Sequence, residues 1–167
     1  IEVFVMTPAA VKLDLKVADA VWVAAAMLHR ANPRRVGFTV AEIVEKVKAE
    51  GLTEGKDVSI YTHVNQHCVS NRPPNDAKLR MLDELDGDLR RLHCPNEPSH
   101  PARNGRFCPE PKDLSYELLP LLGWYEEWCQ KQATRAREED PLLELAGTGS
   151  GRWERDAVSY VSRLREE

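Results

Sequence analysis

The stretch that decides the fold runs from Phe38 to Gly51, FTVAEIVEKVKAEG, and is followed after a short gap by 59–69, SIYTHVNQHCV. In the first segment Thr39 and Glu42 stand three residues apart, which is the spacing of a capping box at a helix start. Gly51 stands where a helix ends, because glycine tolerates the left-handed conformation that closes many helices. The pattern therefore predicts a helix that begins after Thr39 and ends before Gly51.

The second segment predicts a short polar helix with Ser59 as its N-cap. Its inward anchors are expected at every fourth position, and they are Ile60, Val64 and Cys68. This spacing leaves Tyr61, Thr62, Asn65 and Gln66 on the outward face. An earlier helix is predicted over 17–30, where apolar residues recur at helical spacing and Pro33 follows.

The region downstream of the polar helix predicts a β-hairpin. Residues 89–93 alternate in the manner of a strand, and 106–108 are expected to be the returning strand after a turn-rich loop. Residues 77–85 fit either a helix or the descending strand. A helix, a turn, a polar helix and a hairpin follow one another in the order of a winged helix-turn-helix, an arrangement that points to duplex DNA.

The predicted fold class is mainly α with a small β-wing, that is, a winged helix-turn-helix plus a C-terminal helical extension. We expect an N-terminal strand or arm over 1–16, with 2–6 as the strand, and the winged domain over 17–130. An aromatic helix over 115–132, with Pro120 in its first turns, should pack on that domain. Residues 131–167 are then a polar linker and a partner-binding tail.

Composition places the chain among soluble globular proteins. Of 167 residues, 42% are hydrophobic and 30% are charged, and no apolar run reaches the roughly 20 residues that a membrane span requires. Four cysteines, at positions 68, 94, 108 and 129, form no dense framework. We therefore expect reduced thiols in a cytoplasmic protein that does not contact a membrane.

Charge is unevenly distributed along the chain, whose net charge is −4. Residues 113–167 carry 7 basic and 12 acidic groups, whereas 90–106 carry four arginines against Glu97 alone. Local positive charge, not net charge, decides phosphate contact. We therefore predict that the polar helix reads bases and that arginines neutralise phosphates, although that helix carries no Arg or Lys between Ser59 and Ser70. The predicted DNA-binding residues are Tyr61, Thr62, Asn65, Gln66, Arg72, Arg90, Arg91, Arg103 and Arg106.

Metal and catalytic sites are weaker interpretations of the same sequence. Two histidines and two cysteines are a suitable ligand set for zinc, and the chain offers His93, Cys94, His100 and Cys108. Their spacing, however, lacks the closely spaced Cys or His pairs that are typical of a zinc site. A disulfide between Cys94 and Cys108 is conceivable in geometry and disfavoured in a reducing compartment. A catalytic dyad of His67 and Cys68 is the alternative to a core position for Cys68. An acidic metal site at 84, 86 and 88 is the alternative to a solvated turn. We expect no enzyme activity, metal or cofactor, and the question of a metal at the four His and Cys positions stays open.

Several segments carry a resemblance to a known family. Residues 38–43, 59–64, 91–95 and 109–128, together with Asn71, resemble a prokaryotic winged helix-turn-helix family that is found alone and joined to nucleases or other defence modules. Residues 140–165 resemble the C-terminal tails of antitoxins that pair with PIN-domain toxin nucleases. The resemblance implies a sequence-specific DNA-binding regulator, an antitoxin-like autorepressor that binds a toxin through its tail. Because binding by a single small module would be weak, we also expect a homodimer. The implied partner-binding residues are Leu142, Leu143, Trp153, Val158, Val161 and Leu164.

Two other functions remain open from the sequence. A winged domain without a basic recognition helix suits a protein-interaction adaptor, and a recognition module of a restriction-type system is the third alternative. The surface charge over 61–72 and 90–106 distinguishes the DNA-binding regulator from the protein-interaction adaptor. A continuous positive face favours DNA, whereas an apolar or acidic face favours a protein partner.

Overall fold

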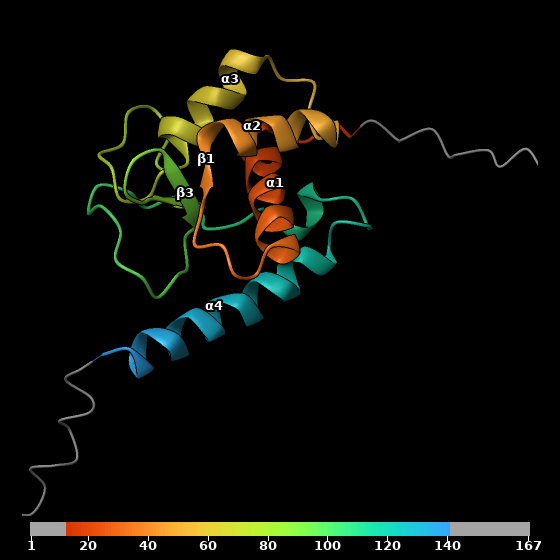
Figure 1. Ribbon diagram of the computed structural model, residues 1–167. Coiled ribbons are helices and arrows are strands. Elements are labelled where there is room, and N and C mark those ends of the chain that lie inside the picture. The colour runs from red at the N-terminus through yellow and green to blue at the C-terminus, as the bar shows by residue number, and fades with distance from the viewer. Residues whose placement is uncertain (1–12, 141–167) are drawn as a thin grey trace, which may run out of the picture. The chain divides into compact units, whose positions relative to one another are not determined.

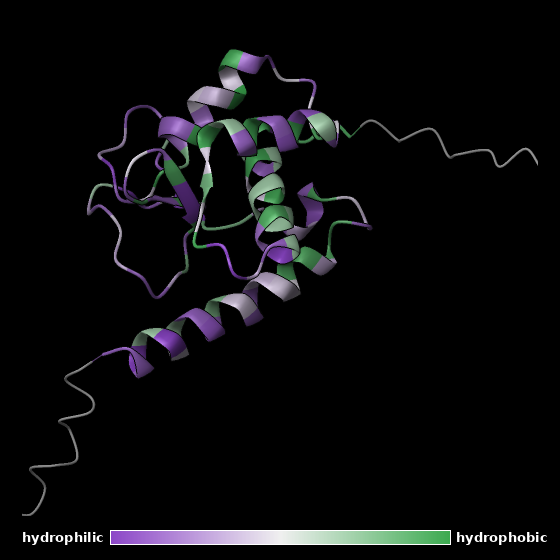
Figure 2. Ribbon diagram, viewed as in Figure 1, coloured by the Kyte–Doolittle hydropathy of each residue, from purple (hydrophilic) through white to green (hydrophobic). Residues whose placement is uncertain are grey.

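The computed structural model describes residues 13–140, and its core is built around the buried helix α1, Val17–Ala31 (Figure 1). Every residue from Ala20 to Ala26 is fully buried, as expected for a helix that is apolar on all sides. Figure 2 shows α1 as the most continuously hydrophobic helix. The helix ends where the Asn32 backbone and side-chain amides both donate to the Leu28 carbonyl. The predicted helix over 17–30 is confirmed.

Helix α2, Val40–Ala49, begins with the predicted capping box. The Glu42 backbone N–H donates to Thr39 Oγ1 at 3.1 Å, and the Thr39 N–H donates to the Glu42 carboxylate at 2.8 Å. Two hydrogen bonds from the Arg35 guanidinium to the same carboxylate lower the pKa of Glu42 to about 2. Gly51 follows with a φ of 58°, so both predicted ends of this helix are confirmed.

Helix α3, Asp57–Thr62, continues into a π-helical turn, η1, His63–His67. The predicted anchors Ile60, Val64 and Cys68 are all buried and hold this segment against the core. The prediction of Ser59 as N-cap is wrong, because the helix already begins at Asp57. An acidic side chain in the first turn suits the positive end of the helix dipole.

A small antiparallel sheet completes the core, with strands β1, Phe38–Thr39, β2, Leu82–Glu84, and β3, Leu89–Leu92, in the order β1-β3-β2. The hairpin β2–β3 closes through Asp86-Gly87, where Gly87 has a φ of 69°. The undecided segment 77–85 therefore contributes the descending strand. The expected returning strand at 106–108 is wrong, because β3 itself returns alongside β2 and leaves that segment outside the sheet.

Helix α4, Pro120–Glu138, follows a short 3-10 turn, η2, Pro111–Asp113. The expected start at 115 is wrong. Proline suits the first helical position, because its fixed φ is helical and its missing N–H needs no partner there. Near the start of α4, the Tyr125 ring lies 5.3 Å from the Trp22 ring in an edge-to-face contact, and its hydroxyl donates to the His93 carbonyl.

The chain divides into two compact units, Ile1–Glu126 and Glu127–Glu167. The first consists of the helices and sheet described above, and the second, as far as it is described, is the polar end of α4 (Figure 2). The predicted strand over 2–6 and all six predicted partner-binding residues of the tail lie outside the described residues. No helix within 13–140 has the length and apolar character needed to cross a membrane.

The cysteines depart from the expectation of four reduced thiols. Cys68 and Cys108 are free thiols, which excludes the conceivable Cys94–Cys108 disulfide. Cys94 and Cys129 are not free thiols, so the expectation is wrong for these two. Burial raises the pKa of the Cys68 thiol to about 12, which keeps it protonated and unreactive.

The capping box generates the first prediction. We expect Thr39→Ala to lower the free energy of unfolding by about 1 kcal/mol, because one helix N–H loses its acceptor. Urea unfolding of the variant measures this loss. Thr62→Ala is the matched control, since the Thr62 hydroxyl only donates to a carbonyl within its own helix and should cost less than about 0.5 kcal/mol. Equal losses in the two variants would contradict a specific capping role.

His29 generates the second prediction. Its Nε2 atom accepts the Leu92 backbone N–H at 3.3 Å, and burial, followed by the charges of Arg91 and Arg35, lowers the pKa of His29 to about 4. The unfolded chain therefore binds a proton between pH 6.5 and 4 that the folded chain excludes, so stability falls as the pH falls through that window. We expect a loss of about 2 kcal/mol between about pH 7.5 and pH 5 from this group.

Urea unfolding at several pH values between about 7.5 and 4.5 measures this dependence. His29→Gln should flatten the slope. An unchanged slope in His29→Gln would show that other groups cause the acid sensitivity.

Candidate interaction surface around helix α3

The outward face of α3 carries two exposed large hydrophobic side chains next to the exposed Asp57 at the helix start. Val58 is 76% exposed and Tyr61 is 53% exposed, one helical turn apart. Thr62, by contrast, donates its hydroxyl to the Val58 carbonyl at 2.8 Å. Gln66 is exposed farther along, and its Oε1 atom accepts a hydrogen bond from the Asn75 amide at 3.0 Å. Tyr61 and Gln66 thus lie where the sequence predicted them.

Arg90 lies beneath this helix and not on the protein surface. Its side chain is 2% exposed, and its guanidinium donates to the Val64 carbonyl at 3.3 Å and to Asn65 Oδ1 at 3.1 Å. Burial lowers the pKa of Arg90, and the Glu84 carboxylate 3.7 Å away partly compensates the charge. The predicted phosphate contact by Arg90 is therefore wrong. Asn65 is also committed to this internal bond, which leaves its Oδ1 atom unavailable to read a base.

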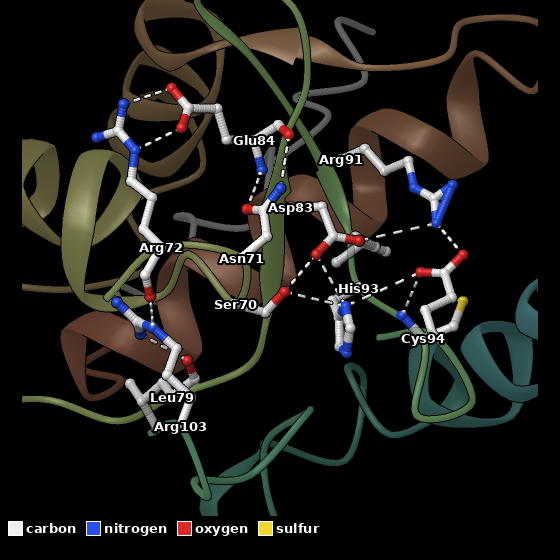
Figure 3. A network of polar contacts seen from close by, with 12 residues as sticks. Ser70, Asn71, Arg72, Leu79, Asp83, Glu84, Arg91, His93, Cys94 and Arg103 are labelled. Carbon is white, nitrogen blue, oxygen red and sulfur yellow. Dashed lines mark hydrogen bonds and ion pairs between the residues drawn. The ribbon is translucent and has the colours of Figure 1, made fainter. Parts of the chain in front are cut away.

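Arg72 and Glu84 form a bidentate ion pair between the segment after the π-helical turn and strand β2 (Figure 3). Asn71 lies beside this pair and bonds the backbone of Glu84 twice, donating to its carbonyl and accepting from its N–H, each at 2.9 Å. The Asn71 amide thus satisfies backbone groups at the open edge of β2. Arg72 is still 40% exposed, but its charge is matched by Glu84.

Arg103 is the second buried arginine, at 3% exposure. Its guanidinium donates to the backbone carbonyls of Gln66, His67, Arg72 and Leu79 at 2.7 to 3.0 Å (Figure 3 shows the bonds to Arg72 and Leu79). Arg103 therefore links the end of the π-helical turn to the loop that leads into β2 through hydrogen bonds to both. The predicted phosphate role of Arg103 is wrong for the same reason as that of Arg90.

The remaining predicted arginines are also paired with acids. Arg106 lies 2.7 Å from the buried carboxylate of Asp19 and 3.7 Å from Asp113. Arg91 contacts Glu97 directly and lies 3.8 Å from Asp83. Arg90 and Arg91 face Glu84 and Asp83 across the hairpin, so the pairing follows from the strand register. The sequence contains this signal, since two acids and two arginines flank Gly87 at matching distances, although we predicted phosphate contacts for both arginines.

Asp83, His93 and Glu97 form a compact polar cluster with Ser70 (Figure 3 shows its labelled members). His93 Nδ1 lies 2.8 Å from Asp83 Oδ1 and 3.1 Å from Ser70 Oγ. Hydrogen bonds from His93 and Ser70 lower the pKa of Asp83 against the opposing effect of burial, which is the largest single influence. Asp83 stays ionised in this setting.

The chemistry of this cluster is structural. A Ser-His-Asp triad needs the serine and the carboxylate on opposite ring nitrogens, whereas here both contact Nδ1 and the serine is fully buried. The ligand atoms of Asp83, His93 and Glu97 lie within 4.8 Å of one another, close enough for a metal ion. However, the Arg91 guanidinium already supplies positive charge to both carboxylates. Among residues 13–140, the four His and Cys positions of the zinc alternative do not form a ligand group.

A shallow groove of about 570 Å³ lies beside the hairpin β2–β3. Val36, Leu85 and Leu89 supply its apolar lining, and Glu84 and Asp86 supply acidic groups. Val36 is 70% exposed, so a large apolar side chain stands in water here. Asp86 and Asp88 are both exposed at the turn of the hairpin, which makes this end of the molecule acidic.

Comparisons of the chain with protein-family models, with curated proteins and with solved structures gave no match. The function of this chain is therefore inferred from its own contacts, burial and charge.

Arg103 generates the third prediction. We expect Arg103→Gln to lower the free energy of unfolding by about 3 kcal/mol, because several buried carbonyls lose a charged donor at once. Urea unfolding measures the loss. Arg34→Gln is the control, since Arg34 is exposed and should change stability by less than about 0.5 kcal/mol. A stable Arg103→Gln protein would argue that the guanidinium is free to serve a ligand.

Proposed function

We propose that this protein is a winged-helix interaction module that docks a protein partner on the outward face of α3 and on the acidic hairpin β2–β3. The observation that carries the proposal is the burial or pairing of every arginine that the sequence assigned to phosphate. Arg90 and Arg103 are 2% and 3% exposed, and Arg72, Arg91 and Arg106 each contact a carboxylate.

The order of elements supports the winged-helix part of the proposal. Helices α1, α2 and α3 precede the hairpin β2–β3, and the short strand β1 between α1 and α2 pairs with β3. Helix α3 then presents one face to the core and the other to solvent, as the recognition helix of such a module does. The fold class proposed from the sequence is compatible with this arrangement, which has four α-helices and three strands within residues 13–140.

Charge favours a protein over a nucleic acid as the ligand of this surface. Binding to duplex DNA depends on cations that displace counterions from phosphates. The hairpin instead presents Asp86 and Asp88 at its exposed turn, where a phosphate would be repelled. The outward face of α3 adds Val58 and Tyr61, and exposed apolar and aromatic residues are typical of protein-binding surfaces.

The hairpin groove indicates the chemistry of the partner. Val36, Leu85 and Leu89 offer an apolar lining, and Glu84 and Asp86 surround it with negative charge. A partner segment that carries apolar anchors next to Lys or Arg is complementary to this groove. The resemblance of residues 140–165 to antitoxin tails suggests a toxin nuclease as one protein partner, bound through the tail.

Sequence-specific DNA binding is the second candidate function, and the exposed groups before α3 and on the π-helical turn η1 favour it. Gln66 is exposed on this segment and can bond an adenine edge, while Lys56 precedes the helix and is also exposed. Within residues 13–140, these two side chains and Tyr61 are the best-placed groups of this face for contact with DNA. An antitoxin-like autorepressor would use this face for its operator and its tail for a toxin.

Titration of the full chain with its own promoter duplex and with mixed-sequence duplex, over a salt series, tests the choice between these candidates. We expect no promoter preference and a shallow dependence on salt, because the arginines predicted to contact phosphate are buried or paired with carboxylates. Gln66→Ala and Lys56→Gln should then change little. A promoter preference that Gln66→Ala removes, together with a salt slope that Lys56→Gln reduces, would establish the DNA-binding function instead.

A photoreactive phenylalanine analogue placed at position 61 tests the protein-docking surface in cells of the source organism. We expect discrete protein adducts whose yield falls sharply with Val58→Asp. The same analogue at position 116, which replaces an 87% exposed tyrosine that is not part of α3, is the control and should give no discrete adduct. Equal labelling from both positions would contradict docking on α3.

A further inference from the structure

Two histidines on the π-helical turn after α3 form a pair that neither candidate function uses. His63 and His67 are four residues apart and both are half-buried, so each ring is in part accessible to solvent. Their ring centroids lie 4.9 Å apart at an interplanar angle of 72°. Two histidines at this spacing on one helical face are a recurrent ligand pair for zinc.

Hydrogen bonds fix the tautomer of each ring. His63 Nδ1 lies 2.8 Å from the Ser59 carbonyl, which can only accept, so this nitrogen carries the proton. His67 Nδ1 lies 2.8 Å from Asn75 Oδ1, and the Asn75 amide donates to Gln66 Oε1 at 3.0 Å, which orients its oxygen toward His67. Both Nε2 atoms therefore carry the lone pair, and neither is hydrogen-bonded to any residue within 13–140.

This arrangement is the one that metal-ligating histidines show. Such a histidine donates its other ring N–H to a carbonyl, a carboxylate or a similar oxygen, which fixes the ring and raises the basicity of the ligand atom. His63 and His67 each have such an acceptor.

Buried contacts on the core side fix the backbone of the turn that carries the two rings. The Cys68 N–H donates to the His63 carbonyl at 3.0 Å, which closes the π-helical turn between the two histidines. Arg103 bonds the carbonyls of Gln66 and His67, and the buried Val64 anchors the middle of the turn. Single π-helical turns occur frequently at functional sites, and this one spaces the two rings.

We propose that His63 and His67 bind a divalent transition-metal ion, Zn²⁺ or the tighter-binding Cu²⁺, through their Nε2 atoms. Imidazole nitrogen suits both ions, and for a given site Cu²⁺ binds more tightly than Zn²⁺. Two protein ligands leave further coordination positions for water or for a side chain of a bound macromolecule. The site stands on the geometry of the pair and holds for either candidate function, because it depends on neither.

Calorimetric titration of the full chain with ZnCl₂, and separately with CuCl₂, at about pH 7.5 tests the site. We expect one ion per chain, with binding at this site lost in His63→Gln and in His67→Gln. Asn75→Ala should weaken the affinity by about 10-fold, because His67 loses the acceptor that orients it. His100→Gln, which removes a half-exposed histidine elsewhere, is the matched control and should bind as the wild type does.

The ring nitrogen resonances of the wild-type protein provide a measurement that needs no variant. Zn²⁺ should shift the Nε2 resonances of His63 and His67 and leave that of His93, which is fully buried, in place. Thermal unfolding of each variant checks that it is folded. Unshifted Nε2 resonances, or an affinity that His63→Gln leaves intact, would overturn the proposal.

Discussion

The hydrogen bonds from the buried Arg90 guanidinium to the π-helical turn η1 are the constraint on which the rest of the structure depends. Strand β3 supplies the arginine, and the Val64 carbonyl and the Asn65 side chain accept from it. A buried guanidinium is costly to desolvate unless each donor finds a partner. The sheet and the helix must therefore keep one relative position, because a shift of either would leave a charge unsatisfied in the core.

Arg103 extends the same principle to the loop after α3. Its bonds to the carbonyls of Gln66, His67, Arg72 and Leu79 replace the regular pairing that a strand or helix would have provided. Glu84 then balances Arg72, and Asp83 and Glu97 balance Arg91. The arginines that the sequence suggested for phosphate contact thus bond carbonyls and carboxylates of the protein itself. They add little positive charge to the outer face of α3.

Local rules account for the parts of the fold that could be predicted. The Thr39–Glu42 capping box, the end of α2 at Gly51 and the apolar helix over 17–31 depend on neighbours within a few residues, so the sequence alone reveals them. The same holds for the inward anchors of α3. The returning strand was misplaced because two candidate segments follow residue 85, and only pairing with β1 and β2 selects 89–92 over 106–108.

The sequence by itself determined the helical framework and the polar character of α3, because each follows from periodicity or capping. Only the tertiary structure decided where the charges lie. An arginine in a sequence carries no mark of whether its partner is a phosphate or a carbonyl 31 residues away, as for Arg103 and Arg72. The acceptor that Asn75 offers to His67 likewise arises only when the π-helical turn and the loop after it are folded together.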